Sequence, residues 1–230
     1  MTPGPDRMIR VQRVTLGRMQ NPVRGFLHGT AAIMSLAGLV ALLALNPGGL
    51  STGVALAVYA GSLVVLYTTS SLYHSVPWSD TWKLRMRRLD HSNIFLVVAG
   101  TYTPFAAVAL EGAWRSASLT AVWTAATVGI ILKFAQKQVR LGLSVTIQSV
   151  MGWAAVIPMW QIGNRLGVSA VILIAIGGLL YTVGMVFMLT GRPQLFPRVF
   201  SSHELFHVMV VAASAVHFVA ILLHVLPNAA

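Results

Sequence analysis

Residues 201–226, SSHELFHVMVVAASAVHFVAILLHVL, decide how the rest of this chain is interpreted. The stretch opens with polar residues that include His203 and His207, and it then continues almost entirely with apolar residues. Histidines four positions apart lie about one turn apart on the same face of a helix, so both can bind one metal ion. The apolar part is long enough for a helix that crosses a bilayer. The stretch therefore predicts a metal-binding pair at the point where a membrane helix begins.

The composition indicates an integral membrane protein. Of the 230 residues, 56% are hydrophobic and only 9% are charged, whereas about a quarter of the residues of a soluble domain are charged. The chain has no cysteine, which excludes disulfides, thiolate metal sites and cysteine nucleophiles. A transition metal therefore needs histidine and carboxylate ligands, a donor set that favours zinc. The net charge of +11 is interpreted as contact with anionic lipid headgroups at the cytoplasmic face, and not with nucleic acid.

Seven apolar segments follow a polar tail at residues 1–23, and each is close to the roughly 20 residues that a membrane-spanning helix needs. The chain shows no internal repeat and no long linker. We therefore expect an all-α membrane protein with one seven-helix transmembrane domain over residues 24–227. The expected spans are approximately residues 25–45, 52–74, 92–110, 117–133, 143–161, 168–189 and 203–226.

Positively charged residues gather in alternate loops and predict the orientation in the membrane. Of the sixteen Lys and Arg residues, all except Arg115 and Arg165 fall in the tail or in loops on the same side of the membrane. Loops rich in Lys and Arg stay in the cytoplasm. We therefore expect a multi-pass protein of the plasma membrane with a cytoplasmic N-terminus and an external C-terminus.

The basic loop 75–91 has a pattern of its own. Trp82, Met86 and Leu89 recur in it at helical spacing among four basic residues. This pattern predicts either a short amphipathic helix on the cytoplasmic membrane surface or a solvated basic loop.

The predicted topology brings several polar residues to the same depth at the cytoplasmic side. The second span ends with Ser70-Ser71-Leu72-Tyr73-His74, the third begins directly after Asp90-His91, and the seventh begins at His203. Ionisable residues within or at the ends of spans are costly, and they indicate function. Because these three helix ends lie at one face of the membrane, we expect their polar side chains to meet.

Three histidines with an open coordination position are typical of catalytic zinc sites, in which a bound water has a pKa of about 7. We expect His74, His203 and His207 to be the zinc ligands. Asp90 is the candidate that orients or deprotonates the water, with a helix cap or an ion pair as the alternative. Ser70 lies one turn before His74, where it can hydrogen-bond the water or a substrate carbonyl, support a ligand, or simply pack against a helix.

The remaining histidines are interpreted separately. His28, near the start of the first span, reaches the same depth, and its role as a ligand is left open. His217 lies about 15 Å beyond His207 along the helix, so we expect it to make a hydrogen bond within the membrane. His91 and His224 are interpreted as interfacial residues that hydrogen-bond or extend toward water.

Glu204 has two interpretations. His203-Glu204-Leu205-Phe206-His207 fits the H-E-x-x-H pattern of zinc proteases, in which the glutamate is the general base. Alternatively, Ser201 and Glu204 form a capping box that begins the seventh helix, where a carboxylate also suits the helix dipole. We favour the capping box.

Taken together, these motifs resemble the hemolysin III family, the bacterial branch of the progestin and adipoQ receptor superfamily. The resemblance covers residues 21–226 and includes the seven-helix topology. Its motifs are Ser70-x3-His74, Leu89-Asp90-His91, Gly100-Thr101-Tyr102-Thr103-Pro104 and His203-x3-His207-Val208.

The resemblance implies roles for particular residues. Family members hold zinc with three histidines, which correspond to His74, His203 and His207. The family's aspartate, which engages the zinc-bound water, corresponds to Asp90, and its serine corresponds to Ser70. The superfamily includes the alkaline ceramidases, which implies hydrolysis of lipid amides, and a role in membrane-lipid homeostasis has been proposed for bacterial members.

Four functions are therefore considered. The leading hypothesis is a zinc-dependent membrane hydrolase of a lipid amide or ester, with a membrane lipid as substrate. Its substrate tail would lie among the helices, along Met, Phe and Gly residues of the fifth and sixth spans. The alternatives are a receptor-like or sensor protein with structural zinc, a hemolysin-type cytolytic protein, and an intramembrane metalloprotease that uses Glu204.

Overall fold

The computed structural model describes residues 15–135 and 141–229, and most of these residues are helical. A π-helical turn, Ile221–Val225, and a 3₁₀ turn, Leu226–Asn228, extend the last helix. The described residues form no β-strand. The helices are α1 (Pro22–Ala44), α2 (Leu50–Ser75), α3 (Asp80–Ala109), α4 (Gly112–Ala135), α5 (Leu141–Trp153), η1 (Ala154–Val156), α6 (Met159–Leu166), α7 (Val168–Thr190) and α8 (Ser202–Ala220).

Six helices are long and apolar enough to cross a membrane: α1, α2, α3, α4, α7 and the continuous helix Ser202–Asn228. A further pair, Gly142–Val156 and Met159–Leu166, reaches that length only when taken together, with a bend of 49° between its parts. Pro158 lies at this bend, and its missing N–H cannot continue the helix. The described residues therefore confirm an all-α membrane protein, with seven spans if the bent pair counts as one. The orientation stays a prediction, as do the domain limits, since residues 1–14 of the expected tail lie outside the described part.

The expectations for the basic loop 75–91 are wrong. Residues from Asp80 onward are the first turns of α3 itself, so they form neither a separate surface helix nor a loop. Ser79 occupies the N-cap position and Asp80 the first turn, where a carboxylate suits the helix dipole. No Gly or Pro then follows until Gly100, so nothing in the sequence breaks the helix before it enters the expected span.

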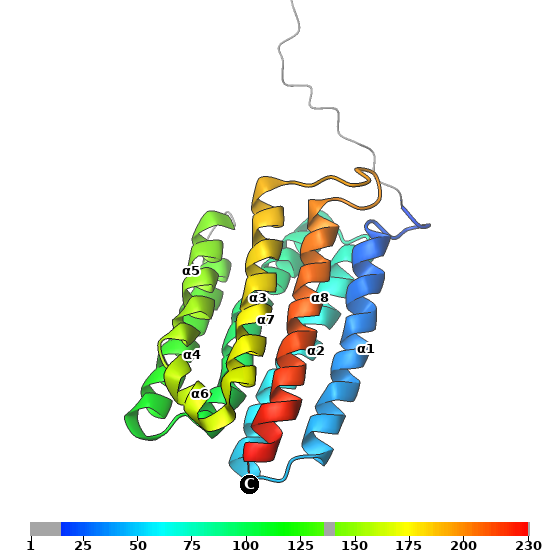
Figure 1. The fold of residues 1–230 in the computed structure, drawn as a ribbon. Coiled ribbons are helices and arrows are strands. Elements are labelled where there is room, and N and C mark those ends of the chain that lie inside the picture. The colour runs from blue at the N-terminus through cyan, green and yellow to red at the C-terminus, as the bar shows by residue number, and fades with distance from the viewer. Residues whose placement is uncertain (1–14, 136–140, 230) are drawn as a thin grey trace, which may run out of the picture.

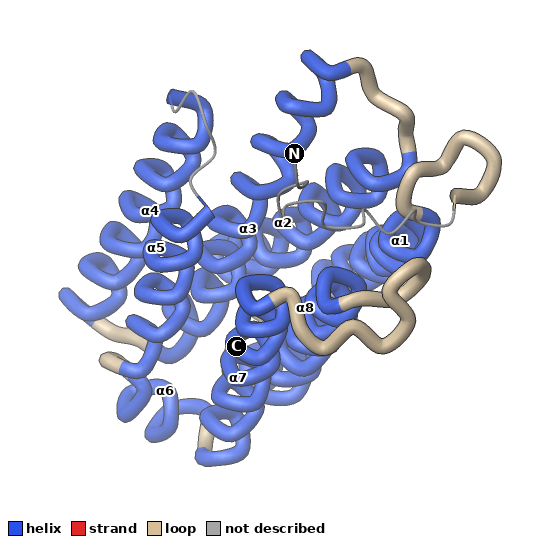
Figure 2. Tube along the Cα trace, turned by 90° about the horizontal axis from the view of Figure 1, so that it is seen from above, coloured by secondary structure: helices blue, strands red, loops and turns tan. Residues whose placement is uncertain are grey.

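The helices form a bundle whose long axes run side by side (Figure 1). α1 and α8 begin, and α2 ends, at the end drawn uppermost, so the polar helix ends of the sequence do meet at one end of the bundle. Seen along the bundle, α8 lies beside α1 and α7, while α5 lies near α4 and α7 (Figure 2). This arrangement places α2, α3, α7 and α8 around one interior.

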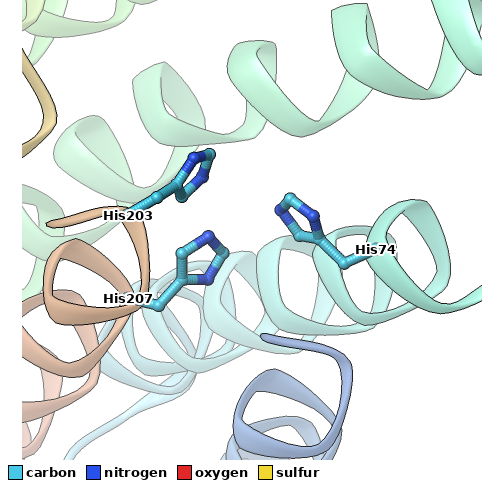
Figure 3. A group of neighbouring side chains, drawn as sticks. All are labelled: His74, His203 and His207. Carbon is cyan, nitrogen blue, oxygen red and sulfur yellow. The ribbon is translucent and has the colours of Figure 1, made fainter. Parts of the chain in front are cut away.

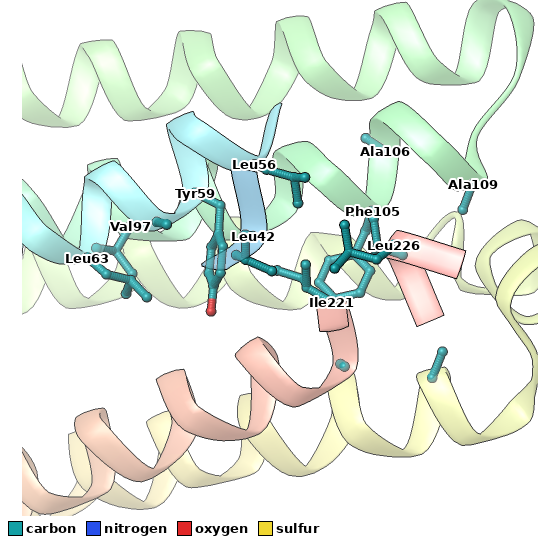
Figure 4. Close-up of a cluster of buried hydrophobic side chains, with 14 of the residues drawn as sticks. Leu42, Leu56, Tyr59, Leu63, Val97, Phe105, Ala106, Ala109, Ile221 and Leu226 are labelled. Atoms are coloured by element: carbon teal, nitrogen blue, oxygen red, sulfur yellow. The ribbon is translucent and has the colours of Figure 1, made fainter. Parts of the chain in front are cut away.

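The interior is apolar and the outer surface is apolar too. A core of buried side chains joins α1, α2 and α3 to the C-terminal turns, with Leu42, Leu56, Phe105 and Ile221 at its centre (Figure 4). Large aliphatic side chains also cover the outside; Ile33, for example, is 71% exposed. An outward-facing aliphatic surface is what lipid tails require.

Two glycines let neighbouring helices approach closely. A Cβ at Gly100 would come within 2.6 Å of Ser62 Oγ across the contact between α2 and α3. A Cβ at Gly184 would come within 2.8 Å of Met209 Cβ, where α7 meets α8. Small residues at helix contacts are typical of membrane bundles, and these contacts set the positions of the helices that carry the polar residues.

Candidate metal centre

The last turn of α2 and the first turns of α8 bring three histidines together. His74 faces His203 and His207, whose side chains project from α8 toward it (Figure 3). The ring centroid of His74 lies 5.5 Å from that of His203 and 4.9 Å from that of His207. Each residue offers one ligand atom, and these atoms all lie within 4.8 Å of one another. The predicted ligand set is therefore assembled and can hold a metal ion.

The surroundings of the three histidines fit a metal. His74 and His207 are buried, at 3% and 2% exposure. His74 Nε2 is buried with no hydrogen-bond partner in the described residues, and an unsatisfied buried nitrogen is costly unless something binds it. Zn–N bonds of about 2.0–2.1 Å in a tetrahedral site need nitrogens about 3.4 Å apart, so modest ring rotations suffice.

His28 has a position that the sequence left open. It lies on α1 outside the three-histidine group, and His207 Nδ1 is 2.8 Å from its Nε2. A metal-binding histidine normally uses its second ring nitrogen to hydrogen-bond a partner that fixes the ring. His28 can therefore orient His207 through Nδ1, which leaves Nε2 of His207 for a metal.

Asp90 and Ser70 lie together in the same region. Asp90 is half-buried and Ser70 is 1% exposed, and the two side chains are close enough to interact. Asp90 sits well inside α3 and does not cap a helix, so that alternative is wrong. Asp90 and Ser70 both line the same cavity as His203 and His207. The catalytic roles predicted for the two residues stay predictions.

Glu204 is engaged by the fold at both carboxylate oxygens. Oε2 accepts hydrogen bonds from the Ser201 backbone N–H at 2.7 Å and from Ser201 Oγ at 2.6 Å, and the capping box is complete. Oε1 accepts a 2.7 Å hydrogen bond from Arg24 Nε on α1. The preference for a capping box is confirmed. The partner Arg24 was missed, because in the sequence it is one of many positive charges near the tail.

A cavity of about 420 Å³ extends from the histidine group along the interior. Its polar end includes Ser70, Asp90, His203 and His207, and the rest of its lining is mostly apolar. Phe187 is not among its lining residues, whereas Met and Gly residues of the fifth and sixth expected spans line it: Met151, Gly152, Met159, Gly178, Met185 and Met188. Its size is that of small-molecule binding sites.

His217 lies further along the same cavity and makes the expected hydrogen bond, with Nε2 3.3 Å from the Ile174 carbonyl oxygen. Beside it, Ser214 Oγ lies 2.7 Å from the hydroxyl oxygen of Tyr67 and 2.9 Å from that of Tyr181. These contacts provide partners for Ser214, Tyr67, Tyr181 and one nitrogen of His217, whereas His217 Nδ1 has no partner among the described residues. His91 is half-buried and also lines the cavity, so it does not simply extend toward water.

Comparison with known proteins agrees with these features. The family model described as "Haemolysin-III related" matches residues 17–218. Hemolysin-3 of Bacillus cereus is 33% identical over 226 residues, which cover 97% of this chain and 99% of that protein. The Hemolysin-3 homolog of Bacillus subtilis (strain 168) is 31% identical over 199 residues, or 86% of this chain and 90% of that protein.

A more distant relative comes from animals. The human monocyte to macrophage differentiation factor is 25% identical over 171 residues, which cover 71% of this chain and 67% of that protein. The bacterial relatives match most of the sequence, and the family match over residues 17–218 includes the positions of the three histidines. The chain therefore belongs to the haemolysin-III related family of integral, multi-pass membrane proteins, for which the plasma membrane is the expected location.

Proposed function

We propose that this protein is a zinc-dependent hydrolase that cleaves an amide or ester bond of a membrane lipid. One observation carries the proposal. Two histidines of the metal-binding group line the same cavity as Asp90 and Ser70, and the rest of that cavity is mostly apolar. The site thus joins a metal-binding group and a carboxyl group to a space suited to hydrocarbon.

The donor set supports zinc. Three neutral imidazoles without a cysteine are a common ligand set of catalytic zinc, which keeps a fourth position for water or substrate. A bound zinc ion lowers the pKa of its water to about 7 and polarises a substrate carbonyl. His74, His203 and His207 would hold it, with His28 fixing the ring of His207.

The chain's own residues supply the proton transfers. Asp90 takes a proton from the attacking water as the water oxygen forms its bond to the carbonyl carbon. The bond from that carbon to the amide nitrogen or ester oxygen then breaks, and Asp90 returns the proton to the leaving group. Ser70, whose side chain is close enough to interact with the Asp90 carboxyl group, would help to hold that group in position.

A second function is favoured by one feature of the site. The histidines come from two helices, so a metal would cross-link the end of α2 to the start of α8. Such a cross-link would stabilise the fold of a receptor-like or sensor protein without catalysis. The protease hypothesis has no comparable support, because both Glu204 oxygens are already bonded. Cytolysis rests only on the names of the bacterial relatives.

The test compares two aspartates of one helix in detergent-purified protein. Asp90→Asn keeps the shape of the side chain but not its basicity, while Asp80→Asn makes the same change at an exposed position at the start of α3. Zinc content and hydrolysis of a panel of fluorescent amide-linked and ester-linked lipids are measured for each. We expect Asp90→Asn to keep its zinc and to lose about 100-fold or more in rate, with Asp80→Asn unchanged.

Three results would decide against the proposal. Equal rates for Asp90→Asn and Asp80→Asn would remove the proposed base. Zinc content no higher in the wild type than in a protein with all three histidines changed to alanine would remove the metal site. A wild-type protein that holds zinc but cleaves none of the lipids would favour the structural role.

A further inference from the structure

Lys133, in the last turn of α4, is buried in the bundle and has no hydrogen-bond partner among the described residues. Its side chain is 1% exposed, and Nζ makes no hydrogen bond to any residue that the structure describes. Burying an ammonium group without a hydrogen-bonded counter-charge costs several kcal/mol. Long basic side chains near helix ends normally extend to the membrane surface, which Lys133 does not do.

No described carboxylate neutralises Lys133. Asp90 is close to Ser70 and forms no ion pair with any described residue, Glu204 is paired with Arg24, and Asp80 and Glu111 are exposed at other helix ends. The dipole of α4 favours a positive charge in its last turn. The helix dipole explains why a lysine lies at the end of α4. It does not explain why the N–H donors of this lysine are buried without a hydrogen-bond acceptor among the described residues.

Lys133 lines the large cavity, together with His91 from α3 and Gln148 from α5. Gln148 Nε2 lies 3.4 Å from the His91 carbonyl oxygen, which ties α5 to α3 at this place. Arg87, one turn before His91, is close enough to act electrostatically on both His91 and Lys133. Lys133 therefore brings a positive charge to the wall of a cavity whose lining is mostly apolar.

We propose that Lys133 binds the anionic headgroup, a phosphate or carboxylate, of an amphiphile whose hydrocarbon chain lies in the cavity. The anion supplies the missing acceptor, since hydrogen bonds between charged groups are the strong ones. The mostly apolar walls supply the place for the chain. If this amphiphile is the substrate, the inference rests on the proposed function and adds that the lipid is negatively charged. Binding itself requires neither the metal nor turnover.

The experiment measures binding of ether-linked probes, which have no amide or ester bond to cleave. An alkylglycerol phosphate is compared with the neutral alkylglycerol of the same chain and with inorganic phosphate, each titrated into the purified protein. We expect the phosphate amphiphile to bind at least about tenfold more tightly than the neutral one, as one charge-assisted hydrogen bond provides. Inorganic phosphate is expected to bind far more weakly, because it gains nothing from the apolar walls.

The variants assign this preference to one side chain. Lys133→Met removes the charge and keeps the length of the side chain, so the two amphiphiles should then bind within about twofold of each other. Lys133→Arg keeps the charge and should keep the preference for the phosphate amphiphile. Lys83→Met is the matched control, since Lys83 is exposed and bonds only Gln20 among the described residues, and it should bind like the wild type.

Other outcomes would overturn the inference. If the wild-type protein binds the neutral and the charged amphiphile equally tightly, that result alone overturns the inference, and no variant is needed. Inorganic phosphate binding as tightly as the amphiphile would leave an ion site and no lipid site. Both results are independent of the hydrolase test, which fails through the absence of cleavage and not through the loss of charge preference.

Discussion

Replacing Glu204 by Gln tests whether this residue holds the fold together or takes part in chemistry. The side chain of Glu204 is 2% exposed and that of its partner Arg24 is 8% exposed. A glutamine can still accept the hydrogen bonds of Ser201 through its amide oxygen, but its NH₂ group then faces the guanidinium. Glu204→Gln therefore removes the carboxylate that faces the buried Arg24 guanidinium.

The expected loss follows from that burial. Removing one partner of a buried ion pair costs about 3–5 kcal/mol, and the hydrogen bonds kept by the amide place this substitution near 3 kcal/mol. For a chain of this size each kcal/mol lowers the melting temperature by about 2–4 °C, so we expect a drop of about 6–12 °C. The assay is thermal unfolding in detergent with the metal removed by a chelator, because bound metal would add its own stabilisation.

Two controls make the result specific. Glu111→Gln is the same substitution at an exposed glutamate and should change stability by no more than about 0.5 kcal/mol. Arg24→Met combined with Glu204→Gln should cost less than the sum of the single changes, because the two residues interact directly and the double variant removes both charges of the buried pair. Additive effects, or equal melting temperatures for Glu204→Gln and Glu111→Gln, would refute the ion pair. If a folded, zinc-loaded Glu204→Gln protein loses the hydrolytic activity of the wild type, the protease hypothesis would be restored.

Three further predictions use other parts of the structure. His28→Ala should weaken zinc binding by about 10–100-fold, because it removes the partner that fixes His207; competition with a chelator of known affinity measures this, and unchanged affinity would show that His28 is a bystander. Gly100→Ala should destabilise the protein by about 1–3 kcal/mol through its clash with α2, whereas Gly61→Ala, which meets nothing within 4 Å, should not; thermal unfolding compares the two. Because the chain has no cysteine, single Gly49→Cys and Ser79→Cys proteins report the orientation: a membrane-impermeant thiol reagent should label only Gly49→Cys in intact cells, and the reverse pattern would invert the predicted topology.

The spans and the histidine pair follow directly from local sequence. A membrane span requires an unbroken run of apolar residues, and such a run is visible in the sequence whatever the helix packs against. Likewise, His203 and His207 share a face, and Ser201 and Glu204 form a cap, because these relations depend only on the helical repeat. His74 and Asp90 could be added because the order of spans places their helix ends at one side of the membrane.

Relations between helices could not be predicted in this way. The sequence does not specify how far each helix is rotated about its own axis, and that rotation decides that Arg24 meets Glu204 and that His28 meets His207. The rotation of α4 also turns Lys133 toward the cavity. In the sequence, Lys133 lies at the end of an apolar segment and looks like an ordinary interfacial lysine. The start of α3 at Asp80 escaped prediction for a related reason: hydropathy marks where the bilayer begins, whereas backbone hydrogen bonding lets a helix continue into water. The sequence by itself thus determined the membrane class and the candidate metal-binding pair His203 and His207, since both rest on local periodicity. Only the packed bundle decided which polar groups became partners and which charge was left facing the cavity.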